Sequence, residues 1–171
     1  CLLRHGVEIS KNQSFIACIS DALYFTKQDS VSIRDMKETI ISTLTIDNFI
    51  TYQNGNLITD FYDPDTNRPD NIEDPKYLNS VLYSKLTESE IEFFIKVCNA
   101  FENFIAYLNN EDVLIDYTYL WDIICTPNAA LFKEGINLVI LEIPNNDITD
   151  NVNLICPTNH YNSLVYEAQK P

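Results

Sequence analysis

Glycine is scarce in this chain, with 3 among 171 residues, and the phosphate-binding loops GxGxxG and GxxxxGK[ST] do not occur. The sequence therefore argues against nucleotide-binding motifs of those two types. Histidine is equally rare, because the 2 His stand far apart as His5 and His160, and neither CxxC nor HExxH is found. A zinc site has little support from this pattern, and we expect neither a metal nor another cofactor.

Positive charge is also in short supply, since 11 Lys and Arg face 25 Asp and Glu and the net charge is -14. Such an acidic chain is a poor direct partner for a phosphate backbone or an anionic membrane. No apolar run approaches the roughly 20 residues that span a bilayer. We therefore expect a protein partner, with no nucleic acid and no membrane.

The 5 Cys are odd in number and widely spaced, which is not the pattern of a disulfide scaffold. Cys18 and Cys98 fall in apolar helical patterns, where a free thiol commonly packs. We therefore expect reduced thiols and a cytoplasmic setting, the host cytoplasm if the protein is viral. Because the chain begins with Cys1, we expect it to be a fragment of a longer polypeptide.

Hydrophobic periodicity predicts helices first and a small, mostly antiparallel sheet in the C-terminal third, which is an α+β fold in a single domain of residues 1–171. Residues 56–63 fit either a helix or a strand. The acidic, Pro-containing stretch 63–75 is expected to be a mobile loop. The predicted helices cover about 14–25, 31–44, 46–52, 75–85, 88–108, 113–125 and 128–133, and the predicted strands cover 137–143, 152–156 and 163–166.

Three of these predictions are detailed enough to test directly. Asp29 or Ser30 is expected to cap the second helix, and Thr87 with Glu90 is expected to form a capping box. The stretch 137–143 is rich in branched side chains, which predicts a buried strand.

Two distant positions are candidates for chemistry. Ser14 follows the turn formers Asn12 and Gln13 and stands in the first turn of an apolar helix, where unpaired N–H groups favour negative charge. His160 lies between two predicted strands, and Asn162 is placed to orient its ring. The alternatives are structural: Ser14 as an N-cap residue, and His160 bonded to a loop carbonyl.

The stretch Lys11 to Ile19 is in register with the motif D-G-N-C-[LF]-[FY]-x-A-[IL], and His160-Tyr161-Asn162-Ser163-Leu164 is similar to a closing motif His-Tyr-[DN]-[SX]-[VL]. With these two stretches the chain resembles the OTU (ovarian tumour) family of deubiquitinating cysteine proteases, which has both motifs. Between them, Leu120 to Asp122 and Ile136 to Ile143 agree more in order than in letters. This resemblance implies a papain-like, OTU-like cysteine protease fold and ubiquitin or a ubiquitin-like protein as the partner.

The resemblance also implies roles for single residues. Ser14 holds the position of the nucleophilic Cys, His160 that of the general base, and Asn162 that of the residue that orients it. The backbone N–H groups of Asn12, Gln13 and Ser14 would bind the oxyanion.

Three interpretations follow from a Ser in the nucleophile position. The first is an OTU-like domain that binds ubiquitin and is catalytically compromised, because a hydroxyl is a poor substitute for a thiol. The second is an active deubiquitinase in which Ser14 replaces a native Cys. The third is a non-catalytic interaction or scaffold domain of a large polypeptide, such as a viral one.

Overall fold

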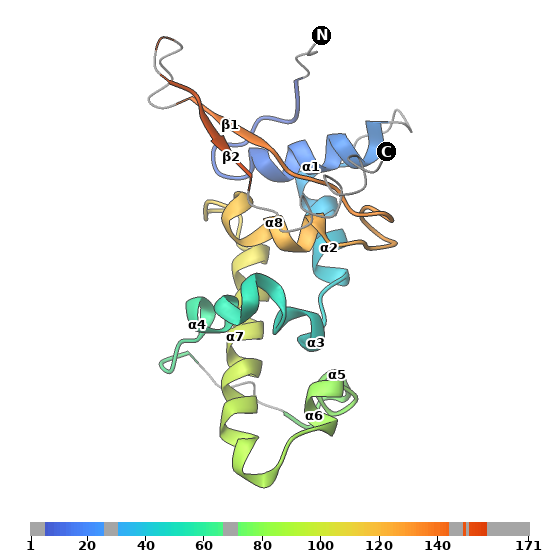
Figure 1. Cartoon of the computed structure of the whole chain (residues 1–171), viewed down its shortest axis with the longest axis vertical. Coiled ribbons are helices and arrows are strands. Elements are labelled where there is room, and N and C mark those ends of the chain that lie inside the picture. Colours follow the sequence, from blue (N-terminus) through green and yellow to red (C-terminus); the bar gives the residue numbers. More distant parts are fainter. Residues whose placement is uncertain (1–5, 26–30, 67–71, 144–148, 150, 157–171) are drawn as a thin grey trace, which may run out of the picture. The chain divides into compact units, whose positions relative to one another are not determined.

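The structure is a computed structural model that describes residues 6–25, 31–66, 72–143, 149 and 151–156 (Figure 1). Its contacts divide the chain into two compact units, Cys1–Asp116 and Tyr117–Pro171, which we describe separately. The described residues are mostly helical, and one antiparallel pair of strands follows the helices. The α+β class with helices first is therefore confirmed, while the single-domain organisation stays a prediction.

The first unit is built around its longest helix, α7, which contacts α2, α3 and α4. Figure 1 shows α4 lying alongside α7, and α1 packs on α2. The helices and 3-10 turns of this unit are α1 (Ser14–Tyr24), α2 (Ile33–Ser42), α3 (Ile46–Phe49), η2 (Tyr52–Gly55), α4 (Asn56–Phe61), α5 (Pro75–Leu78), α6 (Val81–Ser84), η3 (Glu88–Glu90) and α7 (Ile91–Asn109).

Aromatic side chains form the centre of this unit. Phe104 of α7 is fully buried, and its ring centroid lies 4.8 Å from that of Phe61 and 5.6 Å from that of Phe49. The contact with Phe61 is edge-to-face, the arrangement that the ring quadrupoles favour. The helix predicted for residues 88–108 is present, and its buried residues, which include Phe94, Cys98 and Leu108 as well as Phe104, form the core-facing side of α7.

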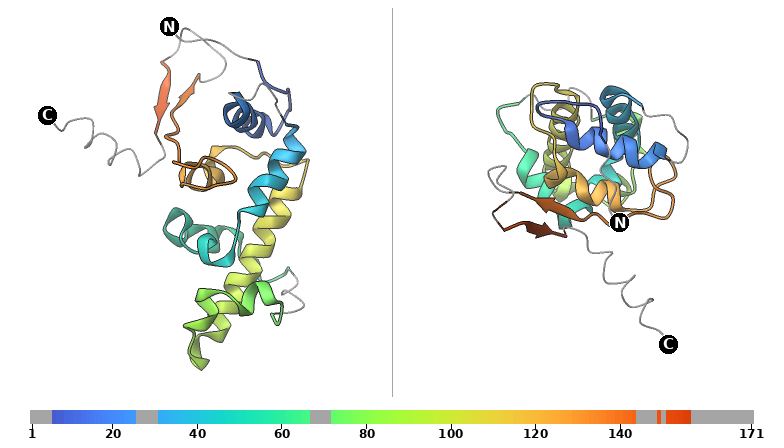
Figure 2. Two further views of the ribbon diagram at one scale, coloured as in Figure 1. Left: turned by 90° about the vertical axis from the view of Figure 1, so that its right-hand side faces the viewer. Right: turned by 90° about the horizontal axis from the view of Figure 1, so that it is seen from above.

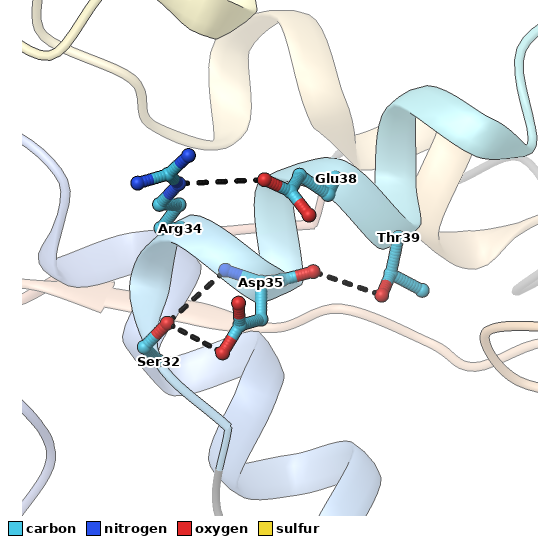
Figure 3. A network of polar contacts seen from close by, with 5 residues as sticks. All are labelled: Ser32, Arg34, Asp35, Glu38 and Thr39. Carbon is cyan, nitrogen blue, oxygen red and sulfur yellow. Dashed lines mark hydrogen bonds and ion pairs between the residues drawn. The ribbon is translucent and has the colours of Figure 1, made fainter.

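The helix starts confirm one predicted cap and correct another. Thr87 and Glu90 form the expected capping box ahead of α7. The N-cap of α2 is Ser32, not Asp29 or Ser30: the Ser32 hydroxyl oxygen accepts the N–H of Asp35 at 3.1 Å and donates to its carboxylate at 2.8 Å (Figure 3). The hydroxyl of the residue directly before α2 thus accepts one of the unpaired N–H groups at the helix start.

The ambiguous stretch 56–63 is helical over Asn56–Phe61, because Leu57 and Phe61, four residues apart, both face the core. The predicted helix 75–85 is instead two short helices. Ser80 interrupts it: its hydroxyl oxygen accepts the N–H of Tyr83 at 3.0 Å and caps α6. Because the Ser80 side chain hydrogen-bonds to the backbone of α6, the chain forms two helices here and not one continuous helix.

The acidic loop 63–75 is described only at residues 63–66 and 72–75. Its first part is held to α7, because the Asn99 side chain accepts the N–H of Asp63 at 3.1 Å and donates to the Thr66 hydroxyl at 3.0 Å. Asn99 is itself buried. The described start of the loop is therefore hydrogen-bonded structure, and mobility of the whole loop stays a prediction.

The second unit contains α8 (Tyr117–Cys125) and a hairpin-like pair, β1 (Ile140–Glu142) and β2 (Asn153–Ile155), visible in Figure 2. The strands are antiparallel, and Leu141 pairs with Leu154. The predicted strands 137–143 and 152–156 are thus present but shorter. The predicted strand 163–166 lies outside the described residues.

Two predictions in this unit are wrong. Residues 128–133 are not a helix, because the Asn128 side chain accepts the N–H of Ala130 at 2.8 Å and the Asn128 N–H donates to Phe132 O at 2.9 Å, which closes a turn. The turn ends at Gly135, whose φ of +71° suits glycine, and an added Cβ would lie 2.5 Å from Cys125 O.

The second wrong prediction concerns burial of the strand 137–143. Val139 and Leu141 are 51% and 61% exposed, and their neighbour across the pair, Leu154, is 65% exposed. Because residues two apart share a face of a strand, one side of the pair is an exposed apolar face. We call Val139, Leu141, Ile143, Val152 and Leu154 the hairpin face.

The aromatic centre of the first unit predicts a sharp contrast between two Phe residues of α7. Phe104→Ala removes a fully buried ring and is expected to lower the free energy of unfolding by about 3–5 kcal/mol. Phe93→Ala is the matched control on the same helix; it is 50% exposed, and its expected cost is under about 1 kcal/mol. Urea unfolding measures both, and equal costs would contradict this core assignment.

Candidate functional site

Ser14 is the first residue of α1, and its hydroxyl is held by the turn before it. The hydroxyl donates to Ser10 O at 2.5 Å and accepts the Ser10 N–H at 3.2 Å. The N-cap of α1 is Gln13 and makes no side-chain cap bond, so the interpretation of Ser14 as an N-cap residue is wrong. The Ser14 hydroxyl instead uses both its donor and its acceptor on the backbone of Ser10, four residues earlier.

The backbone groups expected to bind an oxyanion face a second hydroxyl. The N–H groups of Asn12 and Gln13 both donate to the Ser10 hydroxyl oxygen, at 3.4 and 3.1 Å. Ser10 thus occupies two of the three donors that the sequence resemblance assigns to this role. Sequence reasoning missed Ser10, because it stands outside the motif, although its position ahead of a helix start is a common one for a hydroxyl.

Gln13 fixes the turn to two other parts of the first unit. Its side-chain N–H groups donate to Asn110 O at 2.8 Å and Val113 O at 3.4 Å, and its side-chain oxygen accepts from Lys37 Nζ at 3.2 Å. Lys37 Nζ also donates to Asn110 O at 3.2 Å. Both side chains are buried, 4% and 6% exposed. These contacts, the Gln13 clamp, connect α1, α2 and the segment after α7.

Asn12 adds two further bonds to the same segment. Its backbone oxygen accepts the Ile115 N–H at 2.9 Å, and its side chain donates to Asp112 O at 2.8 Å. The turn before Ser14 is therefore bound along residues 110–115 by both side chain and backbone.

Lys37 belongs to the apolar side of α2, which explains its burial. It lies one residue after buried Met36 and three before buried Ile40. Desolvation by burial lowers the pKa of the Lys37 ammonium, and the Glu111 carboxylate partly offsets that change. A lysine within an apolar stripe was the sequence signal for this contact, since Lys is rarely buried without polar partners.

The remaining expected site residues, His160 and Asn162, lie outside the described residues, as does His5. Of the five expected positions, the structure therefore places Asn12, Gln13 and Ser14 together in one turn. The roles of general base and orienting residue stay predictions from the sequence.

The described cysteines do not offer an activated thiol near the turn. Burial raises the pKa of Cys98 to about 12 and that of Cys125 to about 11. Cys18, one helical turn after Ser14, is exposed as a residue, which corrects the expectation that it packs. Partial desolvation of its thiol and the Asp21 carboxylate nevertheless raise its pKa. A raised pKa leaves less thiolate at neutral pH, so none of these three is activated by its surroundings.

The part of the chain that the structure describes contains no group of three His, Cys, Asp or Glu arranged to hold a metal ion. Among the same residues, no helix is both long and apolar enough to cross a membrane. Comparisons with protein-family models, with curated proteins and with solved structures found no match to this chain. Any function proposed for the turn must therefore be argued from its own residues.

The Gln13 clamp predicts a measurable loss of stability. Gln13→Ala leaves the buried Lys37 ammonium and Asn110 O each short of a partner, which is expected to cost about 1–3 kcal/mol of unfolding free energy. Lys11→Ala, two residues earlier and exposed, is the control and is expected to change stability by under about 0.5 kcal/mol. Urea unfolding decides between them, and similar effects would show that the clamp is not stabilising.

The raised thiol pKa values predict selective labelling. At pH 8, Cys98 and Cys125 are buried and protonated, so a thiol reagent should modify them only when the protein unfolds. The exposed Cys18 and Cys156 should be labelled in the native protein. Mass spectrometry of labelled peptides, with and without urea, tests this; native labelling of Cys98 at the rate of Cys156 would contradict it.

Proposed function

We propose that this chain is an OTU-related, papain-like domain that binds a ubiquitin-type protein and does not cleave it. Two features of the sequence support the relationship: the motif from Lys11 to Ile19 and the closing motif from His160 to Leu164. The helix that begins at Ser14 agrees with the position at which that family starts its nucleophile helix.

The observation that carries the proposal is the set of hydrogen bonds around Ser10. Hydrolysis requires a base to take the hydroxyl proton of Ser14, but that proton is donated to Ser10 O, a backbone carbonyl that is not a base. It also requires free backbone donors for the oxyanion, whereas those of Asn12 and Gln13 are bonded to Ser10 Oγ. The polar atoms of this turn are thus bonded to one another, which supports a role in stabilising the fold and not in hydrolysis.

The net charge of -14 agrees with a role in binding. A strongly acidic domain attracts a partner with a basic surface and speeds their encounter. This argument concerns the kind of partner surface and does not depend on catalysis.

A second candidate function is a scaffold or interaction domain, for example within a large viral polypeptide, that has no affinity for ubiquitin. The hairpin face favours it, because five large apolar side chains between 43% and 65% exposed are typical of a surface that contacts another protein.

Binding and cleavage should separate in this domain. Titration with mono-ubiquitin, followed by NMR of the labelled domain, is expected to shift signals in the Ser14 turn. Incubation with di-ubiquitin is expected to give no hydrolysis. Hydrolysis at ordinary enzyme rates would contradict the compromised site, and the absence of any shift at high concentration would favour the scaffold function.

Ser14→Cys is the matched variant, since it changes one atom at the candidate position. It is expected to gain reactivity towards ubiquitin carrying a C-terminal electrophile, and a further His160→Ala change is expected to remove that reactivity. A natural gene that encodes Cys at position 14 would replace this proposal with an active deubiquitinase.

A further inference from the structure

A polar cavity of about 600 Å³ lies beside the Ser14 turn, within the first unit. Its wall includes Ser10 and Gln13 from the turn and Lys37 from α2. The volume falls in the range of small-molecule sites, about 300–1,000 Å³. The lining is charged and polar, however, so an apolar ligand would be poorly matched and a charged one well matched.

The buried ammonium of Lys37 lies in this wall, and its hydrogen bonds do not compensate its charge. Its two hydrogen-bond acceptors, Gln13 Oε1 and Asn110 O, are both neutral, and an ammonium has three protons to donate. Across the described residues Lys37 forms no ion pair with a carboxylate. The Glu111 carboxylate attracts this ammonium, but the atoms that hydrogen-bond to it are both neutral, so an anionic group entering the cavity would gain from contact with it.

The other charges of the cavity restrict what that anion can carry. Glu8 accepts the Ile33 N–H at 3.1 Å, and Glu38 is paired with Arg34 at 3.4 Å on the exposed side of α2 (Figure 3). Glu111 is exposed, and its carboxylate interacts electrostatically with Lys37. Three carboxylates and two cations line the cavity, so a dianion is repelled, whereas a ligand with one carboxylate and an amine fits both signs.

We propose that this cavity binds a small zwitterion of the amino-acid type, with its carboxylate on Lys37 and its amine against Glu111. Lys37 gains the charged acceptor that its third proton lacks, and Glu111 gains a donor. Ser10 and Gln13, which line the same cavity, place the ligand next to the Ser14 turn. The site does not depend on ubiquitin binding or on hydrolysis.

Calorimetric titration of the whole chain with L-lysine tests the proposal. L-lysine supplies a carboxylate and two amines, and it is expected to bind. Three control compounds, measured at matched ionic strength, are each expected to bind at least about tenfold more weakly. Acetate has no amine, 1,5-diaminopentane has no carboxylate, and inorganic phosphate has no amine and carries extra negative charge. Equal or tighter binding of any of the three would overturn the proposal, as would no binding of L-lysine.

Two variants locate the site. Lys37→Met and Glu111→Gln are expected to weaken L-lysine binding about tenfold each. Lys96→Met removes the same charge from α7, where Lys96 Nζ lies 4.6 Å from the Tyr62 ring centroid, and should leave binding unchanged. Since Lys37→Met also removes clamp contacts, NMR of the unmodified chain gives a second measurement: L-lysine should shift the amide signals of Gln13 and Glu111. Shifts confined to other residues would overturn the proposal.

Discussion

The hydrogen bonds of one buried amide, that of Gln13, determine how the N-terminal part of the first unit is assembled. Gln13 uses both ends of its side chain, donating to carbonyls after α7 and accepting from Lys37 on α2. A buried polar group contributes to stability only when its partners are all present, and here each partner depends on the others. The start of α1, the middle of α2 and the end of α7 are therefore joined by the same small network.

This network changes the meaning of the resemblance to a cysteine protease. In a nucleophile turn the backbone N–H groups point at the substrate and remain unpaired until it arrives. In this chain Ser10 supplies an oxygen to two of them, and the Ser14 hydroxyl is bonded back to Ser10. A turn that is satisfied internally is stable, but the same bonds must break before it can act on a substrate.

The sequence predicted the parts of the fold that depend on local patterns. The apolar stripe of α7, the box of Thr87 and Glu90, and the helix beginning at Ser14 follow from spacing and capping rules, and all are present. Ser32 and Asn128 were misjudged because a short polar side chain can cap a helix or close a turn, and the pattern alone does not decide which.

The candidate site was only partly predictable, for a different reason. Ser14 was found because it lies in a motif, whereas Lys37 and the carbonyls of residues 110–113 belong to no motif. Their importance comes from tertiary contact. The exposure of Leu141 was likewise beyond the sequence, since a run of branched residues reads the same whether or not another surface covers it.

The hydrogen bonds of Asn12 and Gln13 to residues 110–113 join positions 97 to 100 apart in the chain. Closing a loop of that length costs entropy before any contact is gained, whereas α1 and α7 can form from neighbouring residues. These long-range bonds, which tie the turn carrying Ser14 to the rest of the first unit, therefore require the chain to extend beyond residue 110. A chain stopped short of that residue during synthesis would keep the local bonds between Ser10 and Ser14 within reach but would lack every one of these long-range bonds.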